Sequence, residues 1–107
     1  MDIIVQTTIF RVYDDEQEEI MGNRQLRKFA LYQLKEYCDM LTDEEIEDEI
    51  EICISEDKKD RIKEIITDFF NSENKYTEEN YATKISVKDA IELLKLRCFH
   101  VEELKVY

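Results

Sequence analysis

The chain has 107 residues, of which 43% are hydrophobic and 39% are charged, and its formal net charge is −12. This length suits one domain that closes a single core without a metal or a disulfide, and the apolar content excludes a disordered acidic tail. One glycine and no proline argue against a loop-rich sandwich or barrel, which needs turn residues at short intervals. We therefore expect a single domain over residues 1–107 in which helices occupy much of the chain.

The three cysteines are far apart, and each has apolar neighbours: Cys38, Cys53 and Cys98. An odd, unpatterned set of this kind favours buried, reduced thiols over a disulfide framework, which indicates a cytoplasmic location. The sequence has no charged-then-apolar leader, and no apolar run reaches the ~18 residues of a membrane span. We expect a soluble protein that is associated with no membrane.

The first part of the chain predicts a strand followed by a helix. The sequence IIVQTTIFRVY, Ile3–Tyr13, is rich in β-branched and aromatic residues and predicts a long strand. The acidic run DDEQEE, residues 14–19, ends it, and Gly22 with Asn23 provides a turn and a helix N-cap. From Arg24 to Leu41 the spacing of three and four is that of one buried helix face, formed by Leu26, Phe29, Ala30, Leu34, Tyr37, Cys38 and Leu41.

The segment after this helix changes its period. Thr42 and Glu45 have capping-box spacing, which predicts a short turn of helix. Isoleucines then occupy alternate positions up to Ile54, the pattern of a strand with one packed face. We therefore expect a turn of helix that runs into a short strand from Glu49 to Ile54.

The rest of the chain predicts two more helices and a strand. Asp57 can cap a second helix, whose apolar stripe is Ile62, Ile65, Ile66, Phe69 and Phe70. The polar segment Asn71–Asn80 predicts a mobile loop. Ser86 and Asp89 are close to a capping box for a third helix, and its stripe is Val87, Ala90, Ile91, Leu94 and Cys98. The weakly alternating segment His100–Tyr107 predicts a final strand.

The predicted order is strand, helix, strand, helix, loop, helix and strand, with no internal repeat and no linker. Helices and strands that are interspersed in this way form layers around one core. We therefore predict an α+β (or α/β) fold: a single compact domain of about three strands in a small mixed sheet, with three helices.

The negative charge is concentrated in two short runs. Residues 14–19 contain five acids and residues 43–57 contain nine, and neither run contains a basic residue. The other thirteen acids are set against all fifteen basic residues, so the rest of the chain carries a charge of +2. A run of like charges is most often a solvated face that maintains solubility, and the competing interpretation is a surface that meets a basic partner.

No metal motif fits the acids or the thiols. An EF-hand loop with Gly22 at its sixth position would have Gln17 first and Met21 fifth, so its calcium ligands are missing. Zinc needs four ligands at short paired spacings, and here only Cys98 and His100 are close in sequence. We interpret Cys98 as a core residue and His100 as the cap of the third helix, and we expect no metal and no cofactor.

Enzymatic motifs are equally weak. Cys98 and His100 as a nucleophile and base lack an orienting acid and an oxyanion feature. The triplet Glu103-Leu104-Lys105 has the order of a metal and base pair in a nuclease, but no partner acid stands out among the 27. We therefore expect a protein that is not an enzyme.

The acid runs are the candidate binding surface. Duplex DNA is a dense line of negative charge that proteins bind mostly through its phosphates, and fixed carboxylates on a folded protein can occupy the same basic groove. On a strand, Glu49 and Glu51 point to one face, and Glu45 and Asp48 in the preceding helical turn extend the row. The candidate partner-binding residues are Glu44, Glu45, Glu47, Asp48, Glu49, Glu51, Asp14, Asp15 and Glu16.

The expected partner is a protein with a basic surface, such as a nucleic-acid-binding effector. Direct binding of nucleic acid is disfavoured, because the net charge repels phosphates, and we interpret Arg24, Arg27 and Lys28 as intramolecular partners of the first acid run. In size, charge and lack of catalytic motifs the sequence resembles small virus-encoded inhibitors that imitate DNA, of the anti-CRISPR or anti-restriction type. This resemblance implies a phage protein that acts in the cytoplasm as an inhibitor.

The alternative function is that of an immunity, antitoxin or assembly-adaptor protein, which binds through an apolar surface and uses its acids for solubility. Ionic strength distinguishes the two functions, because the affinity of a charge-based inhibitor falls steeply with salt whereas a hydrophobic interface is nearly insensitive to it.

Overall fold

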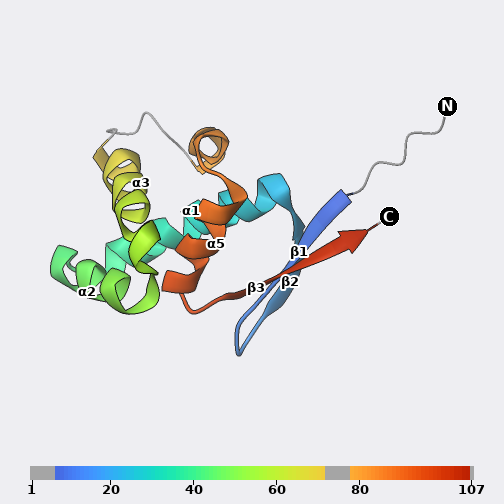
Figure 1. The fold of residues 1–107 in the computed structure, drawn as a ribbon, viewed down its shortest axis with the longest axis horizontal. Coiled ribbons are helices and arrows are strands. Elements are labelled where there is room, and N and C mark those ends of the chain that lie inside the picture. Colours follow the sequence, from blue (N-terminus) through green and yellow to red (C-terminus); the bar gives the residue numbers. More distant parts are fainter. Residues whose placement is uncertain (1–6, 72–77, 107) are drawn as a thin grey trace.

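The elements of the structure follow an order that begins and ends with a strand (Figure 1). The computed structural model describes residues 7–71 and 78–106. Its strands and helices are β1 Thr7–Tyr13, β2 Glu18–Gly22, α1 Asn23–Met40, α2 Asp43–Cys53, α3 Lys59–Asn71, α4 Glu78–Tyr81, α5 Val87–Leu96 and β3 His100–Val106. Two short 3-10 helices, Glu56–Lys58 and Ala82–Lys84, precede α3 and follow α4. The described residues form an α+β domain, the fold class that the sequence predicts.

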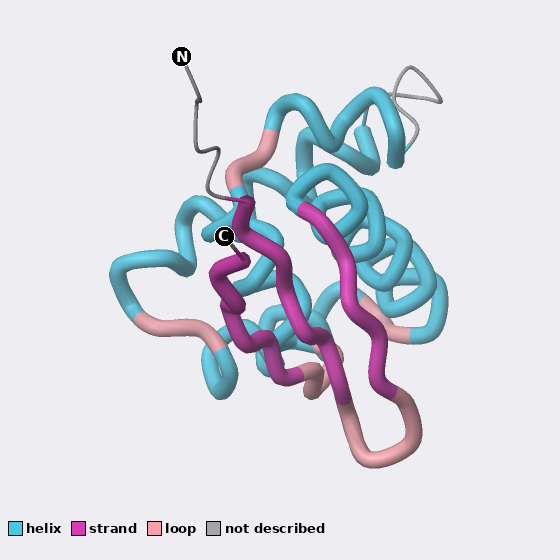
Figure 2. Tube along the Cα trace, turned by 90° about the vertical axis from the view of Figure 1, so that its right-hand side faces the viewer, coloured by secondary structure: helices cyan, strands magenta, loops and turns pink. Residues whose placement is uncertain are grey.

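β1 is the central strand of a three-stranded sheet with the order β2–β1–β3, in which both strand pairs are antiparallel. The register places Phe10 opposite Met21 and Val12 opposite Val101, and residues opposite each other share a face of the sheet. Phe10, Val12 and Met21 are only 3%, 2% and 2% exposed. Figure 2 looks onto the sheet, with the helices behind it. This face therefore joins the core.

An ion-pair cluster crosses the three strands on the other face of the sheet. Arg11 on β1 donates from Nε to Glu18 on β2 at 2.6 Å and from Nη1 to Glu102 on β3 at 3.2 Å. Its guanidinium lies 4.1 Å from the ring centre of Tyr13, and the Tyr13 ring stacks on His100 at 5.2 Å. The expectation that His100 caps a helix is therefore wrong, because its ring belongs to the sheet.

The predicted strand Glu49–Ile54 is wrong, because its residues belong to α2, with Ile54 as the helix C-cap. Ile46, Ile50 and Ile54 recur every four residues and are 7%, 1% and 4% exposed, whereas Ile52 is 78% exposed. Positions four apart share a face in a helix and in a strand alike, so only Ile52 could distinguish the two periods. The capping box at the start of α2 nucleates the helix, and the helix continues through the segment.

β2 takes the place of that strand in the sheet, although the sequence predicts only a turn before α1. Met21 is the only side chain of β2 that is fully buried, and the residues before it are exposed. An edge strand with one buried side chain has no alternating pattern that could reveal it. The spacing of apolar residues therefore could not predict β2. The glutamates of the first acid run, which occupy its start, made the segment resemble a loop.

The helix predicted between residues 24 and 41 is confirmed as α1, but two predicted caps are wrong. Gly22 is the N-cap of α1 and makes no side-chain cap bond, so Asn23 is the first helical residue. Asp57 lies inside the 3-10 helix that leads into α3, and Ser55 is the N-cap of that turn. Backbone geometry rather than a side-chain bond therefore starts both segments.

Both predicted capping boxes are present. The Thr42 hydroxyl accepts a hydrogen bond from the backbone N–H of Glu45, and the Glu45 carboxylate accepts one from the backbone N–H of Thr42. Ser86 and Asp89 make the same reciprocal pair at the start of α5. Each box satisfies two helix N–H groups, which is why α2 and α5 begin at these residues.

Parts of three predicted elements lie outside the described residues: the start of the first strand at 3–6, most of the polar loop at 72–77, and Tyr107. Of the predicted loop, Asn71 is the last residue of α3, and Glu78–Tyr81 forms the one-turn helix α4. The final strand is confirmed as β3, which pairs with β1.

The core is built around α1, which packs against α5 in the middle of the molecule (Figure 1). Leu26 and Leu31 of α1 are fully buried. One residue from each predicted helix stripe is also fully buried, since Leu34, Ile65 and Leu94 are 1%, 0% and 0% exposed. α2 and α3 lie on one side of this pair and the sheet lies on the other. No helix in residues 7–71 or 78–106 is long and apolar enough to cross a membrane.

Two buried polar side chains are satisfied by cations at the surface. Glu92, 5% exposed, accepts hydrogen bonds from the ammonium groups of Lys58 and Lys95, each at 3.1 Å. Gln33, 7% exposed, accepts a hydrogen bond from Nε of Arg97 at 3.2 Å. Pairing of this kind offsets the cost of removing polar groups from water.

α5 ends in a left-handed turn at Cys98. The N–H of Phe99 donates to the carbonyl of Leu94 at 3.1 Å, and the N–H of Cys98 donates to that of Lys95 at 3.0 Å, which is a Schellman motif. Cys98 has a φ of 63°, in the position that glycine most often occupies. Its side chain is exposed, so the prediction that Cys98 is a core residue is wrong.

Replacing Cys98 with glycine is expected to stabilise the protein by about 0.5–1 kcal/mol. A residue with a side chain costs roughly 1–2 kcal/mol in the left-handed region, and glycine removes this cost. Glycine also has greater conformational freedom in the unfolded chain, which cancels part of the stabilisation. The exposed thiol contributes little packing that could be lost. Urea unfolding at constant m value measures the change, and Cys98→Val is the matched control, which should destabilise. Equal destabilisation by glycine and valine would contradict the role assigned to φ.

Candidate interaction surface

α2 turns most of its acidic side chains toward solvent. Ile46 and Ile50 fix one side of the helix in the core, and an α-helix advances by about 100° per residue. Glu49 and Glu51, predicted as neighbours on one face of a strand, are therefore on different sides of a helix. Four acids share an exposed face at the helical spacings of three and four, namely Glu44, Glu47, Asp48 and Glu51.

Three of the six candidate acids of α2 have roles in the fold itself. Glu45 completes the capping box described above. Glu51 pairs with Lys59 at 2.7 Å and with Lys63 at 3.9 Å, and its hydrogen bond with Lys59 holds the pKa of the Glu51 carboxyl below its usual value. Glu49 is half-buried and accepts a hydrogen bond from the thiol of Cys53 at 3.7 Å. Glu51 therefore ties α2 to α3, whereas Glu45 and Glu49 make contacts within α2 and its N-cap, and all three carboxylates are less available to a partner than the sequence suggests.

The other three acids, Glu44, Glu47 and Asp48, form what we call the acidic α2 face. All three are exposed, and none has an ion pair or hydrogen bond from its side chain in the described part of the chain. Ile52 follows Asp48 by one helical turn and is 78% exposed. The surface thus combines unneutralised carboxylates with an exposed aliphatic side chain. A basic partner surface with an apolar hollow could cover this combination.

Asp14, Asp15 and Glu16 of the first acid run are in the loop between β1 and β2, away from α2 (Figure 1), whereas its other two acids belong to β2. Asp14 accepts hydrogen bonds from the backbone N–H groups of Glu16 and Gln17 at 2.9 and 2.8 Å, and these bonds lower its pKa. Asp14 is therefore a residue that shapes the loop. Asp15 and Glu16 are exposed, but the structure does not bring them together with the acidic α2 face.

A hollow of about 320 Å³ lies between this loop and the end of α5, and it is lined by Asp14, Asp15, Glu16, Arg97, Cys98 and His100. It brings the considered pair Cys98 and His100 to one place. No hydrogen bond joins their side chains, since His100 instead stacks on Tyr13. In the ranges 7–71 and 78–106, no group of three or more His, Cys, Asp or Glu side chains is placed to hold a metal ion.

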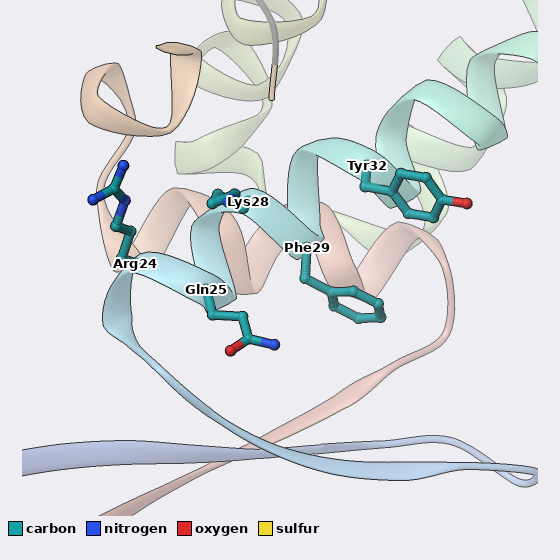
Figure 3. A pocket seen from close by; sticks show the side chains of 5 residues that line it. All are labelled: Arg24, Gln25, Lys28, Phe29 and Tyr32. Carbon is teal, nitrogen blue, oxygen red and sulfur yellow. The ribbon is translucent and has the colours of Figure 1, made fainter. Parts of the chain in front are cut away.

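A shallow basic and aromatic groove of about 680 Å³ lies along α1 from Arg24 to Tyr32 (Figure 3). Its lining residues are Arg24, Gln25, Lys28, Phe29 and Tyr32. Phe29 and Gln25 point from the helix toward the strands, and the Phe29 ring makes an edge contact with Phe99 at 5.4 Å. Tyr32 is 48% exposed and donates a hydrogen bond to Glu36 at 2.8 Å. Sequence reasoning missed this groove, although its spacing of four residues was visible.

Two of the three basic residues at the start of α1 do not pair with the first acid run as predicted. Arg27 donates from Nη1 to the backbone carbonyls of Ala82 at 2.9 Å and Ile85 at 3.3 Å, so it joins α1 to the segment before α5. Lys28 has no ion pair or hydrogen bond from its ammonium group among the described residues. Neither residue therefore neutralises the first acid run.

The side chain of Tyr37 is buried, and nearby carboxylates affect it and two half-buried thiols. The Tyr37 hydroxyl has no hydrogen-bond partner in the described residues, and burial, followed by the charge of Glu49, raises its pKa to about 12. Burial and the nearby carboxylates of Asp39 and Asp43 raise the pKa of Cys38 to about 11. Burial and Glu49 also raise the pKa of Cys53. Both half-buried thiols are therefore poor nucleophiles.

The sequence matches no known protein family, and no characterised protein and no solved structure is significantly similar to the chain.

One thiol of three is expected to react rapidly in the native protein. Cys98 is exposed, whereas Cys38 and Cys53 are half-buried with raised pKa values. The thiolate is the reactive form, and a pKa of about 11 leaves roughly one Cys38 in a thousand ionised at pH 8. Labelling with a coloured disulfide reagent should show one fast and two slow thiols before denaturation, and Cys98→Ser should remove the fast phase. Three equal native rates would contradict the assignment.

Proposed function

We propose that the protein is a non-enzymatic inhibitor whose acidic α2 face occupies the nucleic-acid-binding groove of a basic partner protein. One observation carries this proposal. Glu44, Glu47 and Asp48 are exposed and unneutralised on a helix that is fixed in the core by Ile46 and Ile50. The carboxylates are thus held by a rigid element, and their presentation to a partner requires little further ordering.

The density of charge on α2 supports imitation of DNA. The three carboxylates of the acidic α2 face lie between residues 44 and 48, and at 1.5 Å per residue this segment is roughly 6 Å long. One carboxylate per ~2 Å of helix axis is close to the one charge per ~1.7 Å of duplex DNA. A basic groove releases counterions when it binds phosphates, and this release favours binding. The same release favours the binding of a row of carboxylates.

Ile52 gives the proposed surface a feature that a solubilising face does not need. Among the large hydrophobic side chains that the structure describes, that of Ile52 is the most exposed, at 78%. Charged rims mainly set association rate and salt dependence, whereas buried apolar anchors slow dissociation. An exposed aliphatic residue beside the acids therefore favours a surface that binds a specific partner over a charged face that only maintains solubility.

The alternative function, an immunity, antitoxin or adaptor protein that binds through an apolar surface, has less support. Among the described side chains, the large hydrophobic residues that are exposed away from the acidic α2 face are Ile20, Tyr32 and Met40. They are distributed over β2 and the second half of α1, and scattered apolar residues of this kind are normal on a protein surface.

A displacement experiment tests the proposed function. Proteins of the source organism that bind immobilised duplex DNA are washed with the purified chain, and the eluted proteins are identified and their affinities measured. Wild type should elute one or a few proteins, and Glu44→Lys, Glu47→Lys and Asp48→Lys together should weaken binding at least tenfold. Exposed substitutions of this kind cost no more than about 0.5 kcal/mol of stability each.

The matched control reverses three exposed acids elsewhere, Asp15→Lys, Glu16→Lys and Glu103→Lys, and so changes the net charge equally. Polyglutamate serves as a polyanion without a fold. The proposal predicts that the control variant elutes the same proteins as wild type and that polyglutamate lacks this selectivity. Equal displacement by both triple variants, or no displacement by wild type, would refute the proposed function.

A further inference from the structure

The groove on α1 has a regular order of chemical groups. Arg24, Lys28 and Tyr32 line it at intervals of four residues, so two cations are followed by an aromatic ring along one side of the helix (Figure 3). Phe29 adds a second ring to its floor. The groove therefore suits an occupant with two anions followed by an apolar group at the same spacing.

α2 carries the complementary order on its exposed side. Glu44, Asp48 and Ile52 are also separated by four residues, so two carboxylates are followed by an aliphatic side chain. All three side chains are exposed. The two stripes have equal pitch, and parallel alignment of the helices would place Asp48 against Lys28 and Ile52 against the aromatic rings.

We propose that the α1 groove binds α2 of a second copy of this chain. The two surfaces occupy different parts of the molecule, since α2 is near one end of the long axis and the groove lies along α1 from Arg24 to Tyr32 (Figure 1). The contact is therefore heterologous, and copies associate head to tail. A nucleic acid is the less suitable occupant, because the net charge of −12 repels it and the rings at the end of the stripe can receive an aliphatic side chain.

The same net charge makes this association weak. Two copies repel each other at long range, and salt at physiological concentration screens this repulsion beyond about 8 Å while opposite charges in contact are screened less. Self-association is thus expected at high protein concentration and moderate salt. It does not rest on the proposed function, because no other protein takes part, although it would cover the acidic α2 face.

Charge exchange tests the pairing of Lys28 with Asp48. Sedimentation equilibrium from micromolar to millimolar concentration should show the average mass of wild type rising above that of a monomer. Lys28→Glu and Asp48→Lys should each weaken association about tenfold, because each places like charges in contact. The double variant should recover most of the wild-type association. Lys88→Glu and Asp15→Lys are the matched controls at exposed sites and should behave like wild type.

Mixing the two single variants provides a second test that is independent of folding defects. The Lys28→Glu variant retains a native α2 and the Asp48→Lys variant retains a native groove, so the mixture should associate more strongly than either variant alone. A wild type that stays monomeric at every concentration would overturn the proposal, and another acidic helix would then be the candidate occupant. Association that the two single reversals leave unchanged, or that neither the double variant nor the mixture recovers, would overturn it as well.

Discussion

Burial of α1 against α5 is the contact on which the other elements depend. The two helices pack against each other, and Leu26, Leu31 and Leu34 of α1 and Leu94 of α5 are all at most 1% exposed. Truncation of any one of them to alanine costs about 2–5 kcal/mol, a large part of the stability of a domain this size. The sheet and the α2–α3 pair pack on either side of these two helices (Figure 1). The groove and the acidic α2 face are thus held in fixed positions by one apolar layer.

The acids of the chain divide into structural and free groups once their partners are known. Glu18, Glu51 and Glu92 neutralise cations, whereas Glu45 and Asp14 accept backbone hydrogen bonds. The acidic α2 face remains without such partners in the described residues. Net charge alone therefore overstates the surface available to a partner. The proposed inhibitor function depends on a small part of the negative charge. The basic groove on α1 shows that the surface of this acidic protein also carries a region of positive charge.

Periodicity predicted the elements that bury a full stripe, and it failed where one residue decided between two periods. α1, α5 and their core residues follow from the sequence because their apolar spacing is regular over several turns. The strand predicted at Glu49–Ile54 failed because Ile50 and Ile54 fit both patterns, and β2 was missed because Met21 alone marks it. The candidate acids were found from composition, and the capping box at Thr42 already indicated a structural role for Glu45. The role of Glu51, in contrast, depends on its contact with Lys59, which only the fold creates.

The salt dependence of partner binding tests most directly whether the acidic α2 face is an interface. The affinity of wild type for a protein that it displaces from DNA is measured over a series of salt concentrations, beside the Glu44, Glu47 and Asp48 reversal variant. The logarithm of the wild-type affinity should fall steeply and linearly with the logarithm of salt concentration, as it does for contacts with phosphates, and the reversal variant should have a much smaller slope. A flat line for wild type, or equal slopes for both proteins, would contradict a charge-based inhibitor.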